Sequence, residues 1–196
     1  MNIISKSPIE KFPVVFGFST DLGPGETVVS VVVTCINEAT GVDSATEIVD
    51  SNVIASPDVT VVLKGGTEGD EHAIQCLATT SHGNHYDRDL KLVVESVVDD
   101  CFNKQPGDSF LFDVDFTNRL IHDGESVVSA AIAAIKELDG ASVYGTIVLA
   151  PTVMSPFVGV PVTAGADGMT YRIGVQGTTS LGYVYEKFLR MNLQEF

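Results

Sequence analysis

Apolar and polar residues alternate along this chain in short runs, which is the pattern of half-buried β-strands. The run at residues 27–36 is the densest, and its valines, threonines and isoleucine favour the pleated conformation. Turn residues such as Asp21-Leu22-Gly23-Pro24-Gly25 separate the runs. In the first half we predict an extended lead-in at residues 1–11, followed by strands at 12–18, 27–36, 46–54, 59–63, 72–80 and 86–98.

The second half of the chain repeats the first. Residues 56–94 recur as residues 155–193, displaced by 99 positions with no gap, and GETVVS recurs as GESVVS at the same displacement. From residue 25 to residue 94, 23 of 70 aligned positions are identical, and ahead of residue 25 the displacement is 98. A chain that contains the same unit twice folds as two like domains, so we place domain 1 at residues 1–98 and domain 2 at residues 99–196.

Short apolar strands with a turn signal between each pair are typical of an all-β sandwich. We therefore predict an all-β protein made of two tandem immunoglobulin-like β-sandwich domains. Residues 127–138, VVSAAIAAIKEL, carry an opposing signal, because their alanines favour a helix. The aligned segment of the first copy has a strand composition, and duplicated domains share a fold, so we predict a strand there as well.

One tyrosine suggests a specific feature of immunoglobulin-like sandwiches. Tyr171 enters a predicted strand just after Asp167 and Gly168, as the tyrosine of a tyrosine corner does when its hydroxyl bonds back to the preceding loop. The first copy has His72 at the matching position. Its corner is then either weakened or served by an imidazole nitrogen.

The charge of the chain excludes one class of partner. With 26 acidic and 11 basic residues the formal net charge is −15, so a basic face for nucleic acid is not expected. The acidic surface is interpreted as solubilising, with docking onto a basic partner as the alternative. No apolar run approaches the length of a membrane span, and the start of the chain lacks the apolar stretch of a secretion signal, so neither is expected.

The cysteines do not indicate a disulfide framework, because there are three of them and the second copy lacks two. Cys35 and Cys76 lie in segments predicted to be facing strands, where the second copy has Ala134 and Val175. We interpret both as buried, reduced thiols of a protein made in a reducing compartment. Cys101 has no counterpart and no histidine near it in the sequence.

Histidines and acidic pairs are the candidate metal ligands, and neither group has a recognisable ligand spacing. His82 and His85 flank a predicted hairpin turn, and the other histidines, His72 and His122, are distant. The pairs Asp99-Asp100 and Asp113-x-Asp115 lack the dense acidic loop of a calcium site. We expect solvated turns and strand ends, with no metal and no cofactor.

Catalytic motifs are also missing from the sequence. No Gly-x-Ser-x-Gly elbow occurs, and the candidate nucleophiles Ser81 and Ser180 lie in a repeated Thr-Thr-Ser strand end. Gly65-Gly66 leads into a strand rather than a helix, so it is not a phosphate-binding fingerprint. We expect no enzyme activity and name no catalytic residue.

The first copy resembles a known family in the order of its motifs. A Lys-x-Pro element precedes a strand, DLGPGETVVS follows, and VTVVLKGGTEG and TTSHG complete the pattern. The matching residues are Lys6, Pro8, Leu22, Gly23, Thr27, Val28, Ser30, Val61, Leu63, Gly65, Gly66, Thr67, Gly69, Thr79, Thr80 and Gly83. This resembles the immunoglobulin-like virion proteins of tailed bacteriophages of the fibre–tail and head–tail adaptor type. His72 in place of a family tyrosine and the absence of tryptophan depart from it.

The resemblance implies a structural role in a virion and no active site. It implies an adaptor in the neck or tail region that joins virion components such as portal, neck, tail or fibre proteins, and forms a ring of its own copies. It implies synthesis and assembly in the bacterial cytoplasm. From the charge and the lack of an apolar span, neither nucleic acid nor a membrane is expected as a partner. The alternative is a capsid decoration or fibre-associated module that binds a surface glycan, for which Tyr144, Tyr183 and Phe157 are the candidate loop aromatics.

Overall fold

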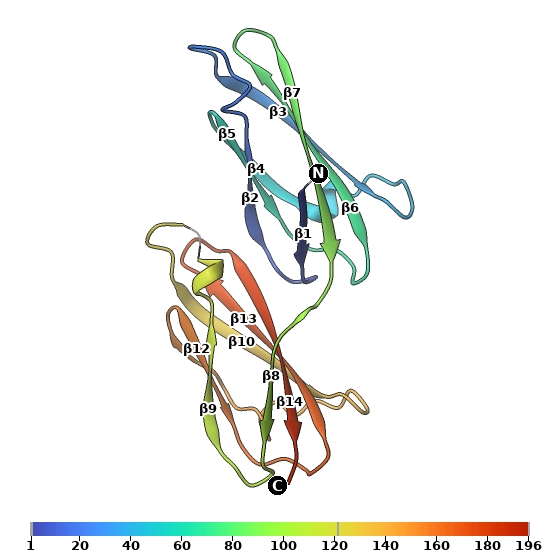
Figure 1. Cartoon of the computed structure of the whole chain (residues 1–196), viewed down its shortest axis with the longest axis vertical. Coiled ribbons are helices and arrows are strands. Elements are labelled where there is room, and N and C mark those ends of the chain that lie inside the picture. The colour runs from blue at the N-terminus through green and yellow to red at the C-terminus, as the bar shows by residue number, and fades with distance from the viewer. Residues whose placement is uncertain (1, 121, 196) are drawn as a thin grey trace. The chain divides into compact units, whose positions relative to one another are not determined.

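The computed structural model describes residues 2–120 and 122–195 of the chain (Figure 1). The chain forms two compact units, Met1–Ser96 (unit 1) and Val97–Phe196 (unit 2). Each unit is a sandwich of two β-sheets, and each has the strand order of an immunoglobulin-like domain. The prediction of an all-β chain with two tandem immunoglobulin-like sandwiches is confirmed.

In unit 1 a four-stranded sheet, in the order β1-β7-β6-β3, faces a three-stranded sheet in the order β2-β5-β4. β1 runs parallel to β7, and the other neighbouring strands are antiparallel. The elements are β1 (Asn2–Lys6), β2 (Phe12–Gly17), β3 (Val28–Asn37), α1 (Ala45–Ile48), β4 (Val49–Ala55), β5 (Asp58–Leu63), β6 (Glu71–Thr80) and β7 (His85–Val94).

Unit 2 repeats this arrangement. Its four-stranded sheet has the order β10-β13-β14-β8 and its three-stranded sheet the order β11-β12-β9, with β8 parallel to β14. The elements are β8 (Val98–Lys104), β9 (Phe110–Asp115), the 3₁₀ turn η1 (Thr117–Arg119), β10 (Val127–Lys136), β11 (Thr152–Met154), β12 (Phe157–Val162), β13 (Thr170–Thr179) and β14 (Val184–Leu193).

The ambiguous alanine-rich segment is a strand, as predicted. β10 and β3 carry the same sequence of buried, partly buried and exposed positions along their ten residues. Both strands have a bulge near their start, between Val28 and Ser30 and between Val127 and Ser129. Cross-strand packing against β13 therefore overrides the helix propensity of the alanines.

One local prediction was incomplete and two were wrong. The extended lead-in contains a strand, β1, because its backbone completes the edge of the sheet beside β7. Residues 46–48, predicted as the start of a strand, belong to the helical turn α1, which ends in the buried Ile48. Val98, predicted as the last residue of a strand, begins β8, which pairs with β14.

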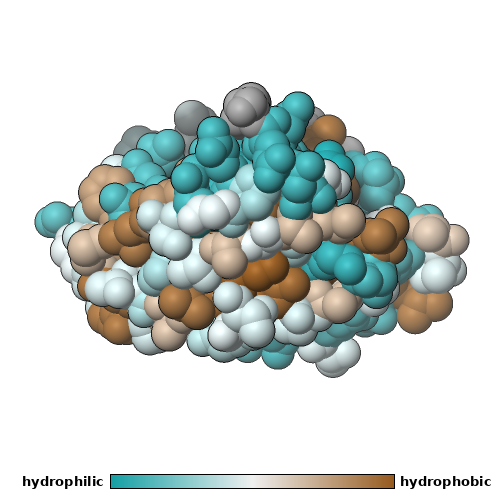
Figure 2. Space-filling view, turned by 90° about the horizontal axis from the view of Figure 1, so that it is seen from below, coloured by the Kyte–Doolittle hydropathy of each residue, from teal (hydrophilic) through white to brown (hydrophobic). Residues whose placement is uncertain are grey.

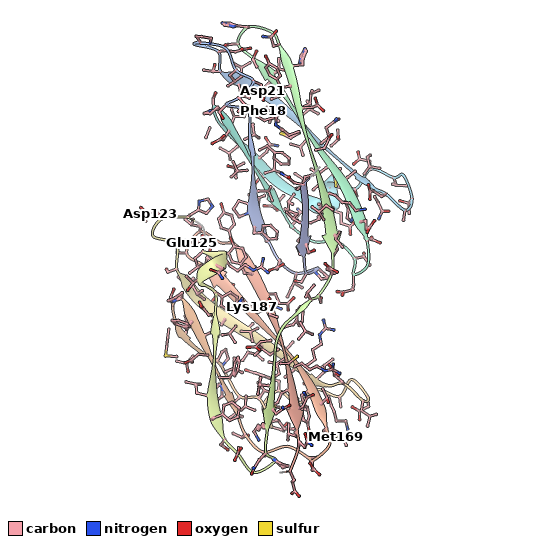
Figure 3. The ribbon with its side chains drawn as sticks, in the orientation of Figure 1. Phe18, Asp21, Asp123, Glu125, Met169 and Lys187 are labelled. Atoms are coloured by element: carbon pink, nitrogen blue, oxygen red, sulfur yellow. The ribbon has the colours of Figure 1, made fainter. Side chains whose placement is uncertain are left out.

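A hydrophobic core lies between the two sheets of each unit, and alternate residues of the inner strands supply it. In unit 1 Phe18, Val61 and Leu92 are fully buried, and in unit 2 Phe116 and Ile173 are. Phe18 follows β2, with Asp21 beside it in the turn (Figure 3). Apolar residues left outside the cores occur in separate groups among hydrophilic ones on the face seen in Figure 2.

Candidate docking surfaces

Two lysines at matching positions are buried in the sandwiches, which sequence reasoning did not predict. Lys6 and Lys104 end β1 and β8, and each is only 2% exposed. Lys104 Nζ donates to the carbonyls of Gln105 at 2.9 Å and Ala164 at 2.7 Å. Lys6 Nζ donates to the carbonyls of Ser7 and Gly65. Burial lowers the pKa of Lys104, and the nearby Asp108 opposes this shift. The lysine of the Lys-x-Pro motif therefore ties two loops together.

The repeated glutamate has a similar structural role. Glu26 in unit 1 is 7% exposed, and its carboxylate accepts hydrogen bonds from the Thr80 hydroxyl, from Asn84 Nδ2 at 2.9 Å and from Gly23 N at 2.8 Å. The Thr80 bond, followed by those of Gly23 and Asn84, lowers the pKa of Glu26 below its ordinary value of 4.5. The motifs GETVVS and TTS, 54 residues apart, meet in this bond.

Replacing Glu26 by glutamine is expected to lower the thermal unfolding midpoint of unit 1 at pH 7, because an amide group would face the Gly23 N–H. A carboxyl whose pKa is lowered on folding stabilises the fold above its unfolded pKa, and loses this effect as the pH falls through the folded value. The gap between wild type and Glu26→Gln should therefore narrow below about pH 4.5. Thermal unfolding from pH 7 to pH 3 measures this, with the exposed Glu71→Gln as the control. A gap that stays constant with pH would contradict it.

The candidate serines also belong to the framework. Ser81 Oγ accepts a hydrogen bond from Thr27 N at 3.2 Å, and Ser180 Oγ accepts one from Ser126 N at 3.3 Å. The serines of the repeated Ser-Pro pairs make a second matched pair of contacts. Ser56 Oγ and Ser155 Oγ accept from Val28 N and Val127 N, each at 3.0 Å. These serines of the repeat thus make the same loop contacts in both units.

The tyrosine corner is present in unit 2. Tyr171 is 2% exposed, and its hydroxyl accepts a hydrogen bond from Ala166 N at 3.4 Å. In unit 1 the imidazole of His72 does not take this place. It is fully buried, its Nδ1 bonds to Ser44 Oγ at 2.9 Å, and its Nε2 has no hydrogen-bond partner among the described residues.

The remaining histidines lie apart from one another. His82 is exposed in the hairpin turn, with its Nδ1 4.0 Å from Glu26 Oε2, and His85 Nδ1 bonds to Thr79 Oγ1 at 3.1 Å. His122 stacks obliquely on Tyr183, with ring centroids 5.6 Å apart. In the described ranges no three His, Cys, Asp or Glu side chains gather as metal ligands would.

The two acidic pairs do come together. Asp99, Asp100, Asp113 and Asp115 line a pocket of about 160 Å³ between β8, β9 and β14. Lys187, which is labelled in Figure 3, is also in its wall. Asp99 accepts a hydrogen bond from Phe188 N at 2.8 Å, and Asp115 accepts from Thr117 N at 2.8 Å. These carboxylates thus hold strand ends and a turn. Unit 1 has a matching pocket of about 180 Å³, in which Arg88 replaces Lys187.

All three cysteines are free thiols. Cys35 and Cys76 lie on the neighbouring strands β3 and β6, and burial raises the pKa of Cys76 to about 11. Neither thiol is a nucleophile at neutral pH, because only the thiolate reacts. Cys101 is exposed on β8.

Each four-stranded sheet has an outer strand with a free middle section. The far ends of β3 and β10 are covered by hydrogen bonds from Ser44 N to Cys35 O, at 2.8 Å, and from Val143 N to Ala134 O, at 2.9 Å. Along the rest of both strands, within the described residues, no further strand is paired on the outer side. Residues 28–36 and 127–135 contain neither charge nor proline, the usual protections of a sheet edge.

Exposed apolar side chains are the other candidate contacts, and sequence reasoning found only some of them. Of the aromatics proposed for a glycan site, Tyr144 and Phe157 are 45% and 40% exposed, while Tyr183 is partly buried. Leu111 and Met154, which the sequence did not single out, are exposed to a similar degree. A comparison of the two copies could have identified these residues, since the first copy has Pro13 and Ala55 at the matching positions. In the part of the chain that the structure describes, no helix is long and apolar enough for a membrane span.

Comparison with solved structures finds several tandem immunoglobulin proteins. A chimeric titin Z1Z2 carrying a decorin peptide is 9% identical, with a TM-score of 0.36, and the match covers 100% of this chain and 94% of that one. The N-terminal Ig1-2 module of the Drosophila receptor protein tyrosine phosphatase DLAR is also 9% identical, with a TM-score of 0.34 over 99% of this chain and 95% of that one.

Sequence comparison gives the family. No curated protein matches the chain. The family model described as podophage GP4 fiber-tail adaptor protein gp77 matches twice, at residues 6–93 and at residues 104–191. Each match lies within one sandwich. The first begins at the buried Lys6, and the second begins at its buried counterpart, Lys104. The chain therefore belongs to the podophage GP4 fiber-tail adaptor protein gp77 family and contains its domain twice in tandem.

Proposed function

We propose that the chain is a structural protein of a tailed-bacteriophage virion, an adaptor in the neck or tail region that joins virion components by protein–protein contacts. The observation that carries this proposal is the double family match, one for each sandwich. The structural role of the repeated polar residues supports this proposal. Lys6 and Ser81, their counterparts Lys104 and Ser180, and Glu26 make framework contacts, which leaves the surfaces for binding.

We also propose that copies of the chain assemble into a ring through the free edges of β3 and β10. These edges carry no charge, so a chain with a net charge of −15 meets the least repulsion there. If the β3 edge of one copy pairs with the β10 edge of the next copy, the contact between them is head-to-tail. Such a contact closes into a ring when the rotation permits.

Deletion of the gene from the phage that encodes it is the test. We expect particles that still package DNA but lack fibres, and purified wild-type virions that contain the chain in several copies. Electron microscopy and quantitative mass spectrometry of the particles measure both. Fibre-bearing particles without the chain would overturn the adaptor role, and a single copy in each virion would overturn the ring. If the chain were found only on the capsid shell, the result would favour the alternative function of a capsid decoration protein.

A further inference from the structure

The outer face of the three-stranded sheet of unit 2 carries three large apolar side chains. Leu111 on β9 is 49% exposed, Met154 on β11 is 44% exposed and Phe157 on β12 is 40% exposed. The register places Phe157 directly opposite both Met154 and Asp115. Three neighbouring strands thus contribute to a single apolar surface.

Gly159 lies at the centre of this surface. A Cβ atom placed there would lie 3.1 Å from a Leu111 methyl carbon and 3.2 Å from Met154 Cε. Leu111 and Met154 therefore close over the glycine from opposite sides, and Gly159 is buried although it is on the outer face of the sheet. We call Leu111, Met154, Phe157 and Gly159 the Gly159 patch.

Unit 1 shows that the fold does not require this patch. The same sheet forms there with Pro13, Ala55, Asp58 and Thr60 at the four matching positions. The patch residues contribute little to the core between the sheets, which Val158 and Val160 supply. Clustered apolar side chains that the fold does not need mark a surface that another molecule covers.

The charge beside the patch is net negative, because Asp113 and Asp115 share their pocket with two further aspartates and a single lysine, Lys187. Asp113 and Asp115 are exposed on β9, opposite Gly159 and Phe157 respectively. Asp115 is held in place by Thr117 Oγ1 at 2.6 Å. A second copy of the chain would bring its own carboxylates and a net charge of −15 against these, so like charges would oppose the contact.

We propose that the Gly159 patch is a docking site for another virion protein, which covers it with an apolar segment flanked by lysine or arginine. This rests on the proposed function, because it deepens the adaptor role by giving unit 2 a contact that unit 1 lacks. The apolar residues supply the buried centre of the interface, and Asp113 and Asp115 supply its charged rim.

Photocrosslinking in the virion tests the proposal. The photoreactive residue p-benzoylphenylalanine replaces Phe157 in one phage and Asp58, the matching residue of unit 1, in another. Purified virions are irradiated, and adducts are identified by mass spectrometry. We expect an adduct at position 157 with another virion protein, in a segment containing lysine or arginine, and an adduct yield at position 58 at least about tenfold lower.

A second variant separates docking from folding. Gly159→Thr introduces the residue of unit 1 and forces Leu111 and Met154 apart, while Thr60→Gly is the matched control. With the photoreactive residue at position 157, Gly159→Thr should lower the adduct yield about tenfold. Thr60→Gly should leave it unchanged. Unaltered far-ultraviolet circular dichroism of both purified variants shows that the fold is retained.

The outcomes separate this proposal from the function on which it rests. Virions that contain the chain but give no adduct at position 157, or an adduct with a second copy or with a segment lacking basic residues, overturn the docking site and leave the adaptor role standing. Equal yields at positions 58 and 157 also overturn it. Virions without the chain overturn the adaptor role, and the virion partner with it.

Discussion

Replacing Lys104 by methionine will destabilise unit 2 by about 3 kcal/mol, because the carbonyls of Gln105 and Ala164 lose the charged donor that the buried lysine supplies. Methionine fills a similar volume, so the loss isolates the hydrogen bonds from the packing. Lys104→Met also removes the desolvation cost of the buried amine, which is the cost that lowers the pKa of Lys104. The loss of these bonds outweighs that gain, since a hydrogen bond to a charged group contributes about 1.5–3 kcal/mol.

Hydrogen exchange followed by mass spectrometry measures this loss for each unit separately. Peptides from β13 and β14 should exchange faster in Lys104→Met, while peptides from unit 1 serve as an internal reference. Lys136→Met is the matched control, because among the described residues the contact of Lys136 Nζ is a surface ion pair with Asp139 at 2.7 Å. Such pairs contribute about 0.5 kcal/mol or less. Equal effects of the two substitutions would show that the buried lysine is not a structural tie.

Replacing Gly66 by alanine is the second change with a large expected cost, about 4 kcal/mol in unit 1. Gly66 has a φ of +94°, where a side chain is strained by about 1–3 kcal/mol. Its new Cβ would also lie 2.8 Å from Val94 Cγ2 and 3.1 Å from Ile48 Cδ1. Both neighbours are fully buried, so neither can give way without disturbing the core.

Gly41→Ala is the matched control for backbone strain. Gly41 has a φ of +68°, and its added Cβ would meet no atom within 4 Å. It should therefore cost about 1 kcal/mol, from the backbone alone. Urea unfolding of both variants, followed by hydrogen exchange in β5 and β6, gives the difference. If Gly41→Ala lowers the free energy of unfolding as much as Gly66→Ala does, crowding is not the reason that position 66 requires glycine.

The two units act as controls for each other in the interpretation of function. Positions that are identical in both copies, such as the serines of the Ser-Pro pairs, make the same contacts in both sandwiches. Exposed positions at which the two copies have different residues give the two units different surfaces. Phe157 in unit 2 and Asp58 in unit 1 occupy the same place in the sheet, but one side chain is apolar and the other is charged. An adaptor with two unlike docking surfaces on one kind of domain can join two unlike components.

The sequence by itself determined the duplication, the strands and the fold class of this protein. Strand formation follows from local alternation and β-branched residues, and the repeat extended the assignment to β10, where alanine propensity opposes it. The helical turn α1 was beyond this reasoning, because its apolar residues continue directly into β4.

Only the tertiary structure decided which residues meet. Glu26 and Thr80 bond across 54 residues, and Lys104 reaches the carbonyl of Ala164 across 60. Leu111 and Met154 close over Gly159 because the pairing of β9, β12 and β11 places them side by side. Strand order and register set these contacts, and both depend on how two sheets pack around a shared core. Local alternation shows that a residue lies on a strand, but the neighbours of its side chain come from strands distant in the chain.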